Sequence, residues 1–89
     1  MKASKRQIFY SNKFLHSFKK LPLDLQTKAF ERERIFKENI FDSRLDTHKL
    51  HGKLKEIWAF SVTGNFRIFF HFVKSGVLFL DIDDHDFYK

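Results

Sequence analysis

The last third of the 89-residue chain is dense in aromatic and β-branched residues and is interrupted by two short polar segments. Thr63-Gly64-Asn65 and Lys74-Ser75-Gly76 are typical of tight turns, where glycine can adopt a positive φ without steric cost. Aromatic and β-branched side chains favour the pleated, half-buried surface of a sheet. The segment therefore predicts three antiparallel strands joined by two turns.

Side chains of the middle predicted strand should alternate between the two faces of this sheet. The first series is wholly apolar and is expected to face the core: Phe66, Ile68, Phe70 and Phe72. The second series includes two polar side chains and is expected to face outward: Arg67, Phe69, His71 and Val73. Any chemistry should therefore be displayed on the outward face, and the upstream segments should cover the apolar one.

Upstream of these strands the sequence predicts one further strand and two helices. Residues 7–10 favour β structure and are expected to pair with the sheet. Ser11 or Asn12 is suited to cap a first amphipathic helix. Pro22 can open a second helix over residues 22–39, because its missing N–H costs nothing in the first turn. Apolar side chains recur in both segments: Phe14, Leu15, Phe18 and Leu21 in the first, and Leu25, Ala29, Phe36 and Ile40 in the second.

This order of elements predicts an α+β fold: an N-terminal strand, a two-helix hairpin, then a three-stranded antiparallel sheet with the helices packed on one face. The length suits a single domain over residues 1–89. No apolar run reaches the length of a membrane span, and none follows the basic N-terminus as in a signal peptide. The lack of cysteine excludes disulfides and thiolate metal sites and fits a cytoplasmic protein.

Basic residues outnumber acidic ones, with 17 lysines and arginines against 11 aspartates and glutamates. The basic residues dominate residues 2–55, and the acidic ones dominate residues 81–86. A small basic domain is a candidate to bind nucleic acid or an acidic protein, although the same charge can serve solubility alone.

Side chains suited to phosphodiester chemistry fall into two groups. The first group lies in a polar loop ahead of the central strands: His48, Lys49, His51, Lys53 and Lys55. The second group joins a strand residue to the C-terminus: Arg67, His85, Phe87 and Tyr88. Arginine offers paired donors to a phosphate, and histidine can give or take a proton near neutral pH. We expect both groups to meet on the outward face of the sheet.

Other chemistries find little support in the sequence. The chain carries no P-loop, no glycine-rich dinucleotide motif and no nucleophile elbow. His48-x-x-His51 is weak as a metal pair, and the acidic C-terminal cluster lacks the EF-hand pattern. No metal or other cofactor is therefore predicted.

The order of several short motifs resembles the RelE/ParE superfamily of toxins from bacterial type II toxin–antitoxin systems. The motifs are Leu50-x-Gly52, Trp58, Phe66-Arg67-Ile68-Phe69-Phe70, and Leu80-Asp81-Ile82 followed by His85-Asp86 and Tyr88. The likeness covers nearly the whole chain, and a helical hairpin ahead of the sheet is also the order of that family. His48-Lys49-Leu50-His51-Gly52 and the C-terminal histidine further resemble the YafQ and YoeB branches, which are ribosome-dependent mRNA endonucleases.

The resemblance implies cleavage of mRNA in the ribosomal A site by attack of a 2′-OH on the adjacent phosphate, with general acid–base catalysis and no metal. It implies His85 as the general acid, Arg67 as the contact to the scissile phosphate and His48 as the base, with His51 or Glu56 as substitutes. Tyr88 or Phe87 would stack on or orient the substrate. The RNA backbone would be held by Lys49, Lys53 and Lys55.

One position departs from the family pattern. Family nucleases often carry a basic residue in the middle of the strand that here spans residues 57–62, and this chain has Ser61 there. The departure favours a second hypothesis, a ParE-like poison of DNA gyrase that has no nuclease site. A third is a degraded toxin that retains only antitoxin binding.

Structural roles remain open beside the functional ones. Arg67 can pair with Asp81 or Asp83 across the ladder, and His85 and Tyr88 can simply fix the chain end. In every case the resemblance, the basic surface and the apolar helical grooves imply an acidic antitoxin as partner, in a complex that can reach a heterotetramer. The ribosome and mRNA are the other expected partners, and no membrane is expected.

Overall fold

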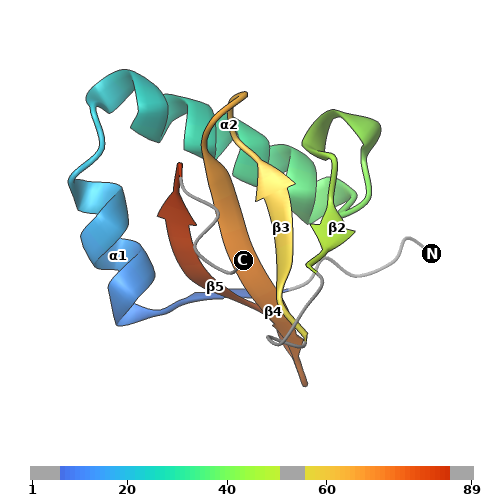
Figure 1. The fold of residues 1–89 in the computed structure, drawn as a ribbon. Helices are drawn as coiled ribbons and strands as arrows, with labels where there is room; N and C mark the ends of the chain where they lie inside the picture. The colour runs from blue at the N-terminus through green and yellow to red at the C-terminus, as the bar shows by residue number, and fades with distance from the viewer. Residues whose placement is uncertain (1–6, 51–55, 85–89) are drawn as a thin grey trace.

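The computed structural model describes residues 7–50 and 56–84. Along them lie β1 (Gln7–Tyr10), α1 (Asn12–Lys19), α2 (Leu23–Glu38), the 3₁₀ helix η1 (Ser43–Leu45), β2 (His48–Lys49), β3 (Trp58–Ser61), β4 (Arg67–Val73) and β5 (Gly76–Asp83). Figure 1 shows the sheet in front and α2 crossing behind β4 and β3. The predicted α+β class is confirmed.

The five strands form one sheet in the order β1-β5-β4-β3-β2. Strands β3, β4 and β5 are an antiparallel meander, as predicted from the aromatic pattern. β1 pairs with β5 at one edge and runs parallel to it, with Gln7 opposite Gly76. β2 forms the other edge and was not predicted, because its two residues, His48 and Lys49, carry no apolar alternation.

Helix α2 buries Ala29 and Phe36, and Phe36 lies at the centre of the core. Its ring stacks on Phe60 of β3 at 4.5 Å between centroids and meets Phe70 of β4 edge-on at 5.0 Å. It also contacts Phe79 of β5 at 5.6 Å. Aromatic pairs at such separations add stabilisation beyond the area that they bury. One helical residue therefore packs against three neighbouring strands at once.

Helix α1 packs along β5 beyond the end of β1. Its N-cap is Ser11, whose Oγ accepts from the backbone N–H of Phe14 at 2.9 Å and donates to the carbonyl of Leu80 at 2.9 Å. A hydroxyl is suited to this double role, because it is at once donor and acceptor. The Ser11 cap therefore also attaches the start of α1 to β5.

The predicted environments of two side chains of β4 were wrong. Phe69 was expected to point outward, but it is fully buried in a second small cluster with Ile57 and Ala59, on the face away from α2. Phe72 was expected in the core, but it lies at the far end of β4 and is 36 % exposed. The alternation itself holds, and the sequence could not show that the outward face has an apolar centre of its own.

The predicted helix bounds are close to those observed. Pro22 occupies the N-cap position of α2 and lies just before the helix. Leu15 was expected on the apolar stripe of the first helix and is exposed. No helix in the described part of the chain is both long and apolar enough to cross a membrane.

The two turn glycines differ in what they require. Neither Gly64 nor Gly76 has a φ in the left-handed region, so the predicted reason for glycine is wrong at both. Gly76 begins β5, and a Cβ added there would lie 2.0 Å from the carbonyl oxygen of Gln7. Around Gly64 no atom of the described chain lies within 4 Å of an added Cβ. Gly76 is therefore needed for the close approach of β1 to β5.

We predict that Gly76→Ala destabilises the protein by about 1–3 kcal/mol, because the new methyl group must displace the backbone of β1. Urea unfolding followed by circular dichroism measures the change. Gly64→Ala is the matched control, since it adds the same methyl group in open space. Equal losses in the two variants would contradict the close-approach explanation.

Candidate functional site

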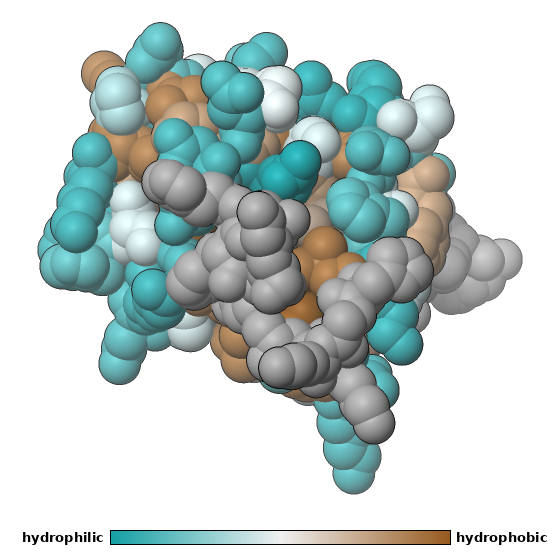
Figure 2. All heavy atoms as spheres, in the orientation of Figure 1, coloured by the Kyte–Doolittle hydropathy of each residue, from teal (hydrophilic) through white to brown (hydrophobic). Residues whose placement is uncertain are grey.

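The strand register places several candidate residues on the face away from α2. His48, Ala59 and Phe69 lie opposite one another across the β2, β3 and β4 strands. The next row on the same face is formed by Ser61, Arg67 and Asp83. Figure 2 views this face and shows hydrophobic atoms near its centre, with hydrophilic atoms around them. The face therefore combines a small apolar centre with polar side chains at its margins.

His48 and Arg67 lie two strands and two residues apart on this face. Strand spacing and rise per residue place their Cα atoms roughly 12 Å from each other. His48 is exposed on the edge strand, and Arg67 is half-buried in the sheet. The structure thus brings these two predicted residues to one face, with the buried Ala59 and Phe69 between them in the register.

The His48 ring is held in one tautomer when it is neutral. Its Nδ1 lies 2.8 Å from the carbonyl oxygen of Asp46, which can only accept a hydrogen bond, so Nδ1 carries the proton. Nε2 is then the nitrogen with a lone pair. Asp46 has a φ of 51°, a left-handed conformation that ends η1 and turns the chain into β2. The local backbone therefore prepares Nε2 of His48 to take a proton.

Arg67 has two neighbours in its row, Ser61 of β3 and Asp83 of β5. The residue that replaces the expected basic side chain, Ser61, thus lies directly beside Arg67. Of the two carboxylates predicted as alternatives for Arg67, the register places Asp83 opposite it and Asp81 opposite Phe69. Arg67 therefore has one hydroxyl and one carboxylate beside it, on either side in the sheet.

Asp81 is fully buried and is bound by α1 instead of by Arg67. Its Oδ1 accepts from the Ser17 hydroxyl at 2.6 Å, and its Oδ2 lies 3.5 Å from Nζ of Lys13. Among the described residues Oδ2 has no hydrogen-bond partner. A buried charge is retained only with such compensation, so Asp81 is part of the α1–β5 contact.

Lys49 does not join His48 on the candidate face. It lies opposite Trp58, and Trp58 lies opposite Phe70 of the main core, so Lys49 is on the α2 face of the sheet. Glu56, a predicted substitute base, is exposed and has a φ of 68° just before β3. The remaining candidates lie outside the described residues: His51, Lys53, Lys55, His85, Phe87 and Tyr88.

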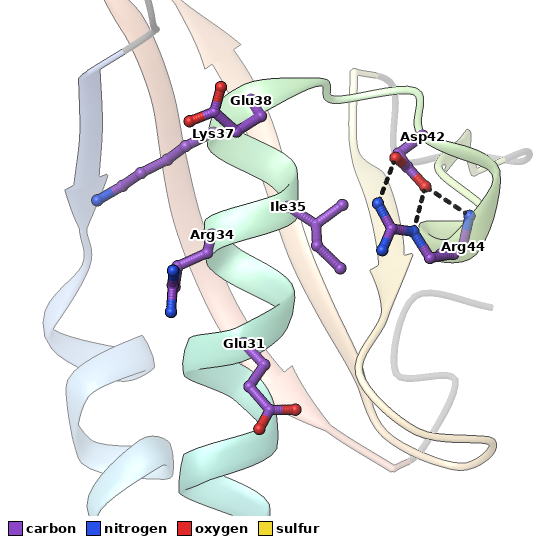
Figure 3. Close-up of a pocket in the computed structure, with 7 residues that line it drawn as sticks. All are labelled: Glu31, Arg34, Ile35, Lys37, Glu38, Asp42 and Arg44. Atoms are coloured by element: carbon purple, nitrogen blue, oxygen red, sulfur yellow. Dashed lines mark hydrogen bonds and ion pairs between the residues drawn. The ribbon is translucent and has the colours of Figure 1, made fainter.

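A pocket of about 480 Å³ between α2 and η1 is separate from the candidate face (Figure 3). Its lining mixes both charges: Glu31, Arg34, Ile35, Lys37, Glu38, Asp42 and Arg44. The Arg44 side chain binds Asp42 through two hydrogen bonds of 2.9 Å and, with the Arg44 backbone N–H, lowers the pKa of Asp42 to about 2. The pocket contains neither His48 nor Arg67, and its balanced charges do not favour a phosphate.

An apolar groove of about 280 Å³ lies between α1 and α2. Phe14, Leu15, Phe18 and Phe30 are among its lining residues, and Leu15 and Phe30 are largely exposed. At one margin the Tyr10 hydroxyl donates to the Glu33 carboxylate, and burial followed by this bond raises the pKa of Tyr10. Tyr10 and Glu33 are 23 positions apart in the sequence, and no sequence pattern predicted that they would pair.

Comparison with known proteins gives similarity of structure without similarity of sequence. No protein-family model and no curated protein sequence matches the chain. A chain of the archaeal RelE–RelB complex from Pyrococcus horikoshii OT3 superposes with a TM-score of 0.74 at 13% identity, covering 93% of this chain and 98% of that one. The YoeB/ParE toxin from Agrobacterium tumefaciens gives 0.74 at 14%, covering 89% and 98%.

A chain of the DinJ–YafQ toxin–antitoxin complex from E. coli superposes with a TM-score of 0.73 at 16% identity, covering 91% of this chain and 93% of that one. Each superposition spans nearly the whole of both chains, and so includes the helices, the sheet and their order. The chain therefore has the fold of the RelE, YoeB and YafQ structures.

Proposed function

We propose that the chain is the toxin of a type II toxin–antitoxin system and acts as a ribosome-dependent mRNA endonuclease. The observation that carries the proposal is the placement of His48 and Arg67 on one sheet face, with Nε2 of His48 prepared as a base. The RelE-like fold supports it, since the superposed structures include the YoeB/ParE toxin and a chain of the DinJ–YafQ toxin–antitoxin complex.

In the proposed reaction His48 Nε2 removes the proton from an RNA 2′-OH. The 2′-oxygen attacks the neighbouring phosphorus, the bond from phosphorus to the 5′-oxygen breaks, and the leaving oxygen takes a proton from an acid. The products are a 2′,3′-cyclic phosphate and a free 5′-OH. The proton balance is complete with one base and one acid, so the reaction consumes no further reactant.

Arg67 is proposed to bind the phosphate on which negative charge grows. A guanidinium stabilises such charge well in a partly dehydrated site, because its donors are fixed in a fork and need little reorganisation. Arg67 is half-buried in its strand beside the fully buried Phe69, so the sheet holds its backbone rigidly. With Cα atoms roughly 12 Å apart on one face, the long side chains of His48 and Arg67 can reach the same phosphodiester above the sheet.

The C-terminal candidates complete the proposal. His85 would be the general acid, and Tyr88 or Phe87 would orient the substrate. Asp83, the last residue of β5, lies in the row of Arg67, and His85 follows two residues later in the sequence. His51, Lys53 and Lys55 would contact RNA from the segment that follows β2, and His51 or Glu56 would be the substitute base.

A gyrase poison of the ParE type is the second candidate function. The observation that favours it is Ser61, which lies beside Arg67 where a nuclease of this fold often has a cation. One superposed structure is itself described as a YoeB/ParE toxin. Loss of one electrostatic contribution slows a nuclease without abolishing it, so cleavage must be measured directly.

The proposed protein partner is an antitoxin that inserts apolar side chains into the groove between α1 and α2. Leu15 and Phe30 stand largely exposed there, and exposed apolar surface in a groove is typical of a site for an amphipathic helix. The net charge of +6 favours an acidic partner. Such a complex can assemble further into a heterotetramer.

We predict that Arg67→Ala lowers the rate of mRNA cleavage by roughly 10²- to 10³-fold, because the growing phosphate charge loses its donor. The measurement is mapping of mRNA 5′ ends after induction of the protein in growing cells, with translation running or blocked. His71→Ala is the matched control, since His71 is a half-buried residue of the same strand and the same face.

Cuts that require translation, disappear in Arg67→Ala and persist in His71→Ala are the expected result. DNA breaks that depend on gyrase, without such mRNA cuts, would replace the nuclease by the ParE-type function. Growth arrest of equal strength in all three proteins would contradict both the nuclease and the role of Arg67.

We further predict that a Leu15→Asp, Phe30→Asp double variant stays toxic but is no longer neutralised by the antitoxin. Both side chains are already exposed, so the change alters the groove and leaves the buried core intact. Growth of cells that produce toxin and antitoxin together is the measurement. Rescue equal to that of the unchanged protein would show that the antitoxin binds elsewhere.

A further inference from the structure

Three aromatic side chains form a partly exposed patch on the α2 face of the sheet, at the end where β2 lies. We call Phe41, Trp58 and Phe72 the ring patch. Trp58 meets Phe41 edge-on at 5.8 Å and Phe72 edge-on at 5.4 Å between centroids. Phe41 is 58 % exposed and Phe72 is 36 % exposed, while Trp58 is half-buried. The three rings are therefore only partly buried in the core, and part of their apolar surface faces solvent.

A lysine accompanies the patch. Lys49 is exposed and pairs with Trp58 across the β2–β3 ladder, where directly opposite residues have Cβ atoms about 5 Å apart. An aromatic surface with a neighbouring cation is the arrangement by which proteins bind single-stranded nucleic acid, because the rings stack on bases and the cation holds a phosphate.

The position of β2 connects the ring patch to the candidate catalytic face. This two-residue edge strand presents His48 on one face of the sheet and Lys49 on the other. Beyond β2 the described sheet has no further strand. A chain that crosses this edge can therefore contact His48 and then reach Lys49 and the rings.

We propose that the ring patch is a second RNA subsite, which stacks unpaired bases next to the phosphodiester held at His48 and Arg67. The inference rests on the proposed function, and it adds where the neighbouring nucleotides bind. RNA fits better than a protein partner because the patch consists of rings with a cation beside it, and the chain as a whole is basic. Stacking is tolerant of sequence, since every base has a flat face.

The test uses the intrinsic fluorescence of Trp58, which is the sole tryptophan of the chain. The purified protein is titrated with a 2′-O-methyl RNA hexamer, which cannot be cleaved because its 2′-oxygen is blocked. A hexamer of the same charge without bases is the control. The expected result is quenching by the RNA and none by the abasic chain. Equal responses would overturn the proposal, because backbone charge alone would then explain binding.

Two variants localise the effect. Phe41→Ala should weaken hexamer binding about tenfold, the loss expected for one stacked base. Lys49→Gln should reduce affinity and its salt dependence while leaving the quenching at saturation unchanged. Phe30→Ala is the matched control, since Phe30 is similarly exposed at 56 % but belongs to the groove between α1 and α2. Unchanged affinity in both patch variants would overturn the subsite.

The outcome is separable from that of the proposed function. Translation-dependent mRNA cuts in cells with no quenching in the titration would leave the nuclease standing and remove the subsite. If Phe41→Ala abolishes the quenching but cells show no mRNA cuts, the ring patch still binds RNA and the proposed nuclease activity is rejected. Concentration-dependent dimers that Phe41→Ala disrupts, without RNA quenching, would assign the patch to a second copy of the chain and overturn the proposal.

Discussion

The packing of Phe36 against three strands is the contact on which the other elements depend. Because its ring meets Phe60, Phe70 and Phe79, α2 can lie across the meander at only one height and rotation. That fixed position leaves the opposite face of β3 and β4 uncovered by α2, and His48 and Arg67 lie on that face. The candidate site therefore lies on the face of the sheet that α2 does not cover.

The sequence was most informative where a pattern is local. The aromatic alternation predicted the three-strand meander, and Ser11 and Pro22 predicted where the helices begin to within a residue or two. The parallel attachment of β1 to β5 was expected only as pairing with the sheet, since nothing in four residues specifies direction. The sequence pattern attributed Gly76 to a tight turn. It did not show the close approach of Gly76 to Gln7, because these two residues are remote in sequence.

The sequence predicted which residue types belong to the candidate site. It was less informative about how these residues are arranged on the sheet. Polar residues near the central strands suggested His48 and Arg67, and the register places them on one face. The same register separates Lys49 from them, a result that depends on a two-residue strand with no hydrophobic signal. Phe69 was misplaced because alternation shows which side a residue occupies, not whether that side is covered.

The pairing of β1 with β5 sets an order on events during synthesis. β1 is translated before its partner Gly76–Asp83, which comes nearly seventy residues later, so this pairing cannot form until β5 has been made. Contacts of such long range are slow to form. The nascent chain therefore lacks its complete sheet until β5 has been translated, and the face that carries His48 and Arg67 is incomplete until then.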